Sequence, residues 1–211
     1  SKIFDSKKAS TLNISNKKNM FMLKKNRVQP LISVILPTYN HARFLKDAID
    51  SVIKQDYSNW ELIIIDNYST DNTDQVISLF KDDRIKNHKI NNHGIIAKSR
   101  NKGIQESKGD WIAFLDSDDI WYLNKLSTII NYLNRYKKID IVCSNEYLHN
   151  KSTGKKHKLR YGPSSKYFYK DLLVNGNKLS TSATLVKRSF LNEKKLFFDE
   201  SKIFITVEDY D

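Results

Sequence analysis

The chain has 211 residues, of which 39% are hydrophobic and 28% are charged, and its formal net charge is +12. This length and composition fit a globular fold with one substantial core. They exclude a membrane-spanning helix, since no apolar run approaches the roughly 20 residues that a bilayer requires. The single cysteine, Cys143, excludes an internal disulfide. No secretory signal pattern opens the sequence, so we expect a cytoplasmic location.

Most of the positive charge lies in two segments. Residues 1–30 contain eight Lys and Arg residues and one acid, and residues 147–170 contain seven and no acid. Nucleic-acid-binding proteins more often place Arg and aromatic residues on a folded face, so we expect no nucleic-acid partner. Solvated lysines are one interpretation of both segments. Attraction to an anionic membrane surface or to an acidic glycan is the other.

Strands and helices are predicted to alternate after a basic, polar leader or linker at residues 1–30. Apolar runs predict strands at 31–36, 60–65, 84–90, 111–115 and 139–144. Helical periodicity and capping residues predict helices at 44–55, 95–106 and 123–133. Capping residues at 69–74 also predict the start of a helix that ends at residue 80. This alternation indicates an α/β fold with a doubly wound, mostly parallel sheet flanked by helices.

The alternation ends at Glu146. Residues 147–163 predict a basic, partly extended excursion, residues 165–174 a short helix and residues 182–187 a strand. The chain then ends on a second acidic cluster, at residues 207–211, where a further helix would be expected. We therefore expect the chain to stop before the end of its domain.

Three carboxylates follow the buried strand at 111–115, at Asp116, Asp118 and Asp119. Ligands of open α/β sheets bind outside the carboxyl ends of the strands. Clustered carboxylates repel one another and lose hydration, so a divalent cation or several backbone donors would stabilise them. The alternative is a solvated turn that caps the next helix.

Other polar residues are expected at the same edge of the sheet. Asp66 ends the second predicted strand, and residues 37–40 follow the first. Arg100 supplies a guanidinium for phosphate. Together they predict a pocket for a nucleoside diphosphate. The sequence lacks the Gly-rich loops of Rossmann dehydrogenases and P-loop enzymes, so a metal must carry the phosphate charge.

Five motifs in this order resemble those of family 2 glycosyltransferases, which have the GT-A fold. They are Pro37-Thr38-Tyr39-Asn40, Ile65-Asp66-Asn67-Tyr68-Ser69-Thr70-Asp71, Asn92-His93-Gly94 through Ser99-Arg100-Asn101, Phe114-Leu115-Asp116-Ser117-Asp118-Asp119, and Glu208-Asp209. The resemblance covers about residues 31–211. It implies a catalytic domain with a nucleotide-sugar half at 31–145 and an incomplete acceptor-side half at 146–211.

The activity implied by the resemblance is metal-dependent transfer of a hexosyl or N-acetylhexosaminyl group with inversion. The donor would be a nucleotide-diphospho-sugar, usually a UDP-sugar, with Mn²⁺ or Mg²⁺ as cofactor. The acceptor would be a glycan or a lipid-linked acceptor, in surface polysaccharide synthesis. Such an enzyme could also associate peripherally with the inner face of an anionic membrane.

The resemblance also implies a role for each matched residue. The nucleotide site would be lined by Pro37, Thr38, Tyr39 and Asn40, and Asp66 would accept a hydrogen bond from the base. Arg100 would face the nucleotide and phosphates. Asp116 and Asp118 would form the metal-binding D-x-D pair, with Asp116 also near the ribose, and Asp209 would be the general base. Each has a structural alternative: packing on the sheet edge for Tyr39, helix capping for Asp66, pairing with a helix acid for Arg100, and the first turn of a helix for Asp209.

The sequence departs from the family pattern in three places. Tyr68 stands where glycine is common, so we expect a less tight loop there. Leu123 replaces a frequent proline, and Arg100 lies one residue further from Gly94 than usual. The five histidines show no metal-ligand spacing and receive no role. The three tryptophans, Trp60, Trp111 and Trp121, are expected in the core or in a pocket wall.

Two other functions compete with glycosyl transfer. A sugar nucleotidyltransferase usually requires a Gly-rich, basic first loop, but residues 37–43 contain no glycine. A basic interaction module would bind polyanions through residues 1–30 and 147–170, with a vestigial nucleotide pocket. Salt-sensitive polymer binding without UDP binding would indicate such a module.

Overall fold

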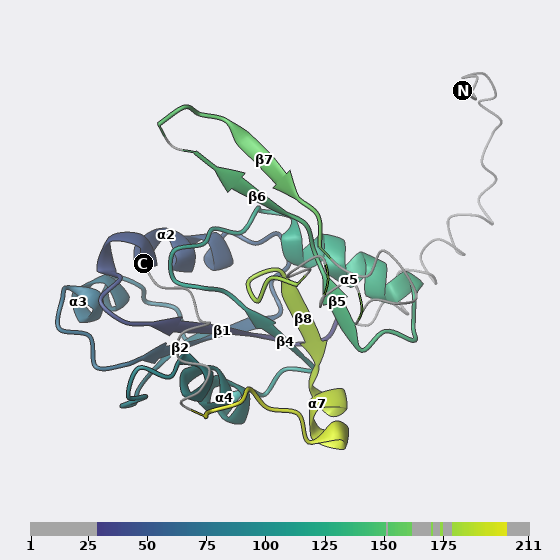
Figure 1. The fold of residues 1–211 in the computed structure, drawn as a ribbon, viewed down its shortest axis with the longest axis horizontal. Helices are drawn as coiled ribbons and strands as arrows, with labels where there is room; N and C mark the ends of the chain where they lie inside the picture. Colours follow the sequence, from purple (N-terminus) through teal and green to yellow (C-terminus); the bar gives the residue numbers. More distant parts are fainter. Residues whose placement is uncertain (1–28, 151, 162–169, 171–173, 175–178, 202–211) are drawn as a thin grey trace.

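The computed structural model describes residues 29–150, 152–161, 170, 174 and 179–201 (Figure 1). Within these residues a six-stranded sheet has the order β3-β2-β1-β4-β8-β5, and β6 pairs with β7 in a separate two-stranded sheet. The strands are β1 (Ile32–Thr38), β2 (Trp60–Asp66), β3 (Ile85–Lys89), β4 (Trp111–Phe114), β5 (Ile141–Cys143), β6 (Glu146–His149), β7 (Lys156–Leu159) and β8 (Thr184–Lys187).

The sheet is mostly parallel, as the sequence predicts. Strands β1 to β4 all run in one direction. β8 is antiparallel to both of its neighbours, β4 and β5. Because β1 to β4 are parallel, their carboxyl ends meet at one edge of the sheet, called here the carboxyl edge. The opposite edge, where these strands begin, is called the amino edge.

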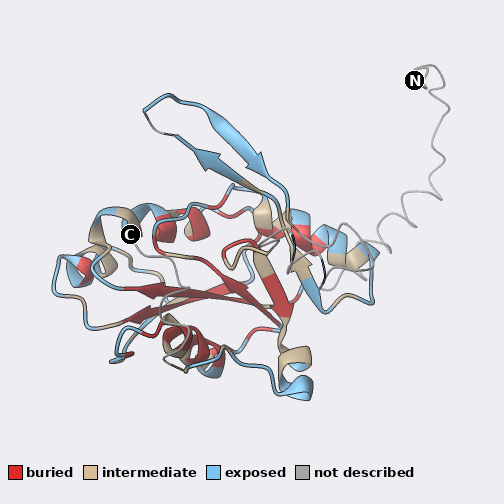
Figure 2. Ribbon diagram, viewed as in Figure 1, coloured by how far each residue is buried: buried red, intermediate tan, exposed pale blue. Residues whose placement is uncertain are grey.

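Helices cover both faces of the sheet (Figure 1). They are α2 (Ala42–Ile53), α3 (Thr73–Ser78), α4 (Ile96–Glu106), α5 (Lys125–Arg135) and α7 (Arg188–Lys194). In Figure 1, α2 and α5 lie above the sheet, whereas α4 and α7 lie below it. The central strands between these layers are buried (Figure 2). Parallel strands covered on both faces are near-continuous apolar runs, which explains why the sequence signal was strong there.

Each face of the sheet has its own core. Ile32, Val34 and Leu36 of β1 pack with α2 and α5, whereas Ile35 of the same strand packs with α4 and α7. Gly103 permits a close approach of α4 to β1, since a Cβ atom there would lie 2.3 Å from Ile35. The three tryptophans are buried in the α2–α5 core, as predicted.

The second half of the chain differs more from the prediction. The basic excursion forms a hairpin of β6 and β7, and α7 follows β8 where no helix was predicted. Most of the helix predicted at 165–174 lies outside the described residues, as do residues 1–28 of the leader and the candidate base Asp209. In the described part of the chain, every helix is too short or too polar to cross a bilayer.

Candidate functional site

The carboxyl edge brings the ends of β1, β2 and β4 together. Thr38 and Asp66 are register partners at the ends of β1 and β2. On the other side of β1, Ile35 is the register partner of Phe114, so Asp116 lies just beyond the end of β4. One strand separates Asp66 from Asp116, which places their backbones about 10 Å apart across the sheet. The sequence prediction that both acids face one edge is therefore consistent with the register.

Hydrogen bonds join the loop after β1 to the loop after β2. The Asn40 backbone N–H donates to the Ser69 Oγ (2.9 Å), and the Asn40 Oδ1 accepts from the Thr70 N–H (2.8 Å). The Asp71 Oδ2 accepts from the N–H of Ala42 at the start of α2 (3.0 Å). These contacts fix the rim of the site. They also leave the Tyr39 side chain 53% exposed, so Tyr39 does not pack on the sheet edge.

Asp66 is fully buried, yet only one of its carboxylate oxygens has a hydrogen-bond partner among the described residues. Its Oδ1 accepts from the backbone N–H and the hydroxyl of Ser69 (3.0 and 2.5 Å). Its Oδ2 has no hydrogen-bond partner there, and the Lys89 Nζ lies 3.7 Å away. The buried Thr38 Oγ1 is likewise without one. Buried polar groups of this kind are uncommon and leave capacity for a ligand.

The loop at Tyr68 corrects one expectation. Tyr68 adopts a left-handed backbone with φ 52°, the region that glycine would favour. The turn therefore keeps the glycine-type conformation despite the side chain. For a residue other than glycine, that conformation costs roughly 1–2 kcal/mol.

Arg100 pairs with an aspartate of the acidic loop, which is the name used here for residues 116–119. It lies on α4 and is 7% exposed, and its Nη2 donates to the Asp116 Oδ1 (3.0 Å). The guanidinium also lies 5.5 Å from the ring centre of Phe198. This pair holds a positive group beside the acidic loop, where an anionic ligand could contact it.

The acidic loop concentrates negative charge. Loss of hydration raises the pKa of Asp119 to about 6, and the nearby carboxylates of Asp116, Asp118 and Glu146 add to this effect. Asp118 is exposed. A divalent cation would relieve this repulsion, so Asp116 and Asp118 fit a metal by their chemistry.

The protein groups of the described residues do not by themselves complete such a metal site. Among the described residues, no three His, Cys, Asp or Glu side chains converge closely enough to hold a cation. Mg²⁺ is usually bound through one or two carboxylates together with substrate phosphates and water. A two-carboxylate loop matches that arrangement.

Two residues that the sequence analysis did not select support the acidic loop. The Asp116 N–H donates to the Ser182 Oγ (2.9 Å), just before β8. The Ser182 carbonyl accepts from the Lys125 Nζ (3.2 Å), which also donates to the Ser144 Oγ (2.9 Å). Burial lowers the pKa of Lys125 to about 8. No local sequence signal could reveal these contacts, because they depend on where β8 inserts.

His41 also contributes to the site, contrary to its unassigned role. Its Nδ1 lies 2.7 Å from the Ser117 Oγ, within hydrogen-bond distance. This contact connects the start of α2 to the acidic loop. The histidine was missed because its partner is a hydroxyl and not a metal.

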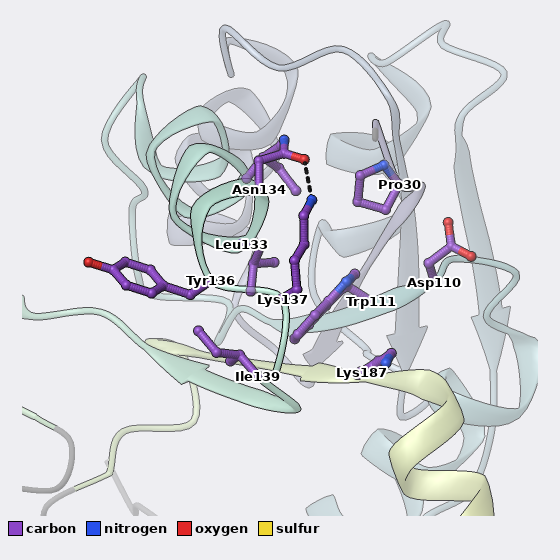
Figure 3. Close-up of a pocket in the computed structure, with 10 residues that line it drawn as sticks. Pro30, Asp110, Trp111, Leu133, Asn134, Tyr136, Lys137, Ile139 and Lys187 are labelled. Carbon is purple, nitrogen blue, oxygen red and sulfur yellow. Dashed lines mark hydrogen bonds between the residues drawn. The ribbon is translucent and has the colours of Figure 1, made fainter. Parts of the chain in front are cut away.

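At the opposite end of the parallel strands, a hollow of about 350 Å³ lies at the amino edge (Figure 3). Its lining comes from the starts of β1 and β4, the end of α5 and the end of β8, and comprises Pro30, Asp110, Trp111, Ile130, Leu133, Asn134, Tyr136, Lys137, Ile139 and Lys187. Two of the lining residues are hydrogen-bonded, since the Lys137 Nζ donates to the Asn134 Oδ1 (3.3 Å) (Figure 3). Since ligands of such sheets bind at the carboxyl ends, we assign the site to the carboxyl edge.

Comparisons with known proteins identify the family of the chain. The sequence profile of glycosyl transferase family 2 matches residues 33–194. An uncharacterized glycosyltransferase of Rickettsia typhi is 33% identical over 196 residues, which cover 90% of this chain and 59% of the relative. The UDP-Glc:alpha-D-GlcNAc-diphosphoundecaprenol beta-1,3-glucosyltransferase WfgD of Escherichia coli is 43% identical over 103 residues, which cover 49% of this chain and 41% of WfgD. The chain thus spans only about half the length of these relatives.

Solved structures show the same fold. Residues 1–349 of Staphylococcus aureus TarS, in complex with UDP-GlcNAc, superpose with a TM-score of 0.66 at 22% identity, over 80% of this chain and 48% of TarS. The mannosyltransferase PcManGT of Pyrobaculum calidifontis, in complex with GDP-Man and Mn²⁺, gives a TM-score of 0.60 at 20% identity, over 89% and 55%. The chain belongs to glycosyl transferase family 2 and has the GT-A fold.

Proposed function

We propose that this protein transfers a sugar from a UDP-sugar to a glycan or lipid-linked acceptor, with inversion and with the help of a divalent metal. The observation that carries the proposal is the shared position of Asp66, Arg100 and the acidic loop 116–119 at the carboxyl edge. Hydrogen-bond capacity, a guanidinium and a cluster of carboxylates are the groups that a nucleotide-diphospho-sugar requires.

The nucleotide half of the donor would lie over the ends of β1 and β2. The buried Oδ2 of Asp66 would accept the N–H of a uracil base, since it has no hydrogen-bond partner among the described residues. The exposed ring of Tyr39 offers a surface for stacking, and Pro37, Thr38 and Asn40 complete the wall. WfgD is named for UDP-Glc, and TarS was crystallised with UDP-GlcNAc, which supports a UDP-sugar, whereas PcManGT was crystallised with GDP-Man.

Asp116 and Asp118 would hold Mn²⁺ or Mg²⁺. When bound, the cation neutralises charge on the diphosphate that leaves the sugar. The Mn²⁺ bound with GDP-Man to PcManGT supports a metal in such a site. Arg100 is kept at the site by its ion pair with Asp116 and would add a positive charge next to the phosphates.

Inversion requires the acceptor to attack from the face opposite the diphosphate. Asp209 would remove the acceptor hydroxyl proton as that oxygen forms a bond to the anomeric carbon, while the bond from this carbon to the diphosphate oxygen breaks. Asp209 lies outside the described residues, so this role comes from its match to the family motif. We expect Asp209→Asn to keep UDP affinity and to abolish transfer in a radiolabelled-sugar assay; unchanged transfer would remove Asp209 from the mechanism.

The acceptor is the least defined part of the proposal. WfgD is named for an acceptor in which GlcNAc is linked through diphosphate to undecaprenol, and WcaA of Escherichia coli is named as a putative colanic acid biosynthesis enzyme. These names support a role in polysaccharide synthesis.

A titration of UDP with and without Mn²⁺ tests the proposal. We expect Mn²⁺ to raise UDP affinity at least about tenfold by calorimetry, since the carboxylates repel the diphosphate without it. Asp118→Asn should remove most of this enhancement. Asp83→Asn, an exposed acid between α3 and β3, is the matched control and should keep it. Absent or metal-independent UDP binding would contradict the proposal.

A further inference from the structure

The described residues of the hairpin of β6 and β7 are exposed, apart from Glu146 at its base. Both strands project from the body of the protein, and seven of their eight residues are exposed (Figure 2). Few contacts join it to other described residues, and an isolated two-stranded hairpin is only marginally stable in water. Its exposed faces therefore favour a partner that covers them.

The hairpin combines cations with exposed apolar side chains. Lys155, Lys156, Lys158 and Arg160 are all exposed. Leu148 is 62% exposed, and Tyr147 and Leu159 are 47% and 37% exposed. Within the described part of the hairpin the one acid is Glu146, at its base, which accepts a hydrogen bond from the Ser180 hydroxyl (2.7 Å).

The strand register separates these side chains onto two faces. Tyr147 pairs with Lys158 and His149 with Lys156 on one face, whereas Leu148 pairs with His157 on the other. Because the hairpin is only two strands wide, its cations lie within about one Debye length of its apolar side chains.

The foot of the hairpin contacts the loop that follows the acidic loop. The rings of Tyr147 and Tyr122 are 5.9 Å apart in an edge-to-face arrangement, and the Lys156 Nζ lies 3.5 Å from the Tyr122 hydroxyl. Ile120 and Leu123 in the same loop are each 60% exposed. The apolar and basic surface therefore begins a few residues from Asp118.

We propose that this surface, formed by β6, β7 and the loop 120–123, docks the protein on an anionic membrane. Clustered lysines are attracted to anionic headgroups, and exposed leucine and tyrosine side chains enter the headgroup region. Nucleic acid would explain the cations but not the exposed Leu148 and Leu159. If the proposed function holds, docking here places the transfer site next to a lipid-linked acceptor.

Vesicle sedimentation of the full chain tests the proposal. Vesicles would contain either phosphatidylcholine alone or phosphatidylcholine with about 30% phosphatidylglycerol. We expect binding to the anionic vesicles only, weakening with salt. The quadruple variant K155Q/K156Q/K158Q/R160Q should bind at least about tenfold more weakly, since each cation near an anionic surface contributes roughly a fivefold increase in partitioning.

Two controls separate a local surface from overall charge. The variant K81Q/K137Q/K138Q/K194Q removes four exposed lysines from other parts of the chain and changes the net charge as much as the hairpin variant does. Its affinity for anionic vesicles should fall less than about threefold. Leu148→Gln leaves the charge unchanged and should weaken binding about threefold or more. Circular dichroism establishes that each variant is folded.

Three outcomes would overturn the proposal. They are absence of binding to anionic vesicles, an equal loss in both quadruple variants, and tighter binding to single-stranded RNA than to vesicles at the same salt concentration. UDP affinity measured on the same proteins keeps the two proposals distinct. The hairpin variant should bind UDP as the unmodified protein does, so loss of vesicle binding alone concerns only docking.

Discussion

Two buried acids on β2 behave differently at the two edges of the sheet. Glu61, near the amino edge, accepts hydrogen bonds from the Ser33 hydroxyl (2.7 Å), the Lys108 N–H (2.7 Å) and the Lys86 ammonium (3.2 Å), so both of its oxygens are engaged. Asp66, at the carboxyl edge, has one oxygen without a hydrogen-bond partner among the described residues. A fully paired acid stabilises the fold, whereas a half-paired acid keeps capacity for a ligand.

The pKa of Glu61 reflects this pairing. Burial raises it, but the hydrogen bonds from Ser33, Lys108 and Lys86 outweigh burial and hold the pKa below the usual carboxyl value. The contribution of Glu61 to stability is therefore present above the unfolded-state pKa near 4.3 and is lost as pH falls further. The negative charge of Glu61 at the amino edge thus stabilises the folded state.

Matched amide substitutions test the contrast most strongly. Glu61→Gln is expected to lower the free energy of unfolding by about 2 to 3 kcal/mol, because charged hydrogen bonds are lost in a buried place, and to leave UDP affinity unchanged. Asp66→Asn should change stability by less than about 1 kcal/mol and weaken UDP binding at least about tenfold, since an amide N–H would face the base. Urea unfolding measures the stability of each variant, and calorimetry measures its UDP affinity. A large loss of stability in Asp66→Asn together with a loss of UDP affinity in Glu61→Gln would contradict the comparison.

Lys125 provides a second test at the carboxyl edge. Its pKa is lowered by burial to about 8, so between about pH 8 and 10.5 the unfolded chain binds more protons than the folded protein. Stability must then rise with pH in that range. From about pH 7.5 to pH 10 the unmodified protein should gain about 1 to 2 kcal/mol relative to Lys125→Met. Parallel unfolding curves for the two proteins would exclude this effect.

The smallest expected effect concerns the backbone. Tyr68 at the carboxyl edge and Lys195 after α7 both have φ 52°. Replacing either by glycine removes left-handed strain but adds freedom to the unfolded chain. Each substitution should therefore raise stability by about 0.5 to 1 kcal/mol in thermal unfolding. If Tyr68→Gly alone lowered the stability, the Tyr68 side chain would have to stabilise the site.

Much of the first half of the fold could be predicted from the sequence. Runs such as Leu31–Leu36 and Trp60–Ile65 are apolar except for Ser33 and Glu61, because their strands are covered on both faces. The order of the strands could not be predicted, since β8 enters between β4 and β5 through contacts distant in sequence. α7 was missed because it is short and has no buried residue.

The candidate site divides in the same way. Asp66 and Asp116 were placed from their positions just after predicted strands, which requires only local information. The pairing of Arg100 with Asp116 and the support from Ser182 and Lys125 depend on packing between distant segments. The roles proposed for all of the site residues, Tyr39, Asp118 and Asp209 included, remain predictions.

The insertion of β8 has a consequence for biosynthesis. β4 gains its second neighbour, and Asp116 its Ser182 partner, from a segment that leaves the ribosome 66 residues later. Until then the nascent chain presents an open strand edge, of the kind on which other chains can pair. Newly made protein therefore needs β8 both to shield the open edge of β4 from aggregation and to complete the acidic loop.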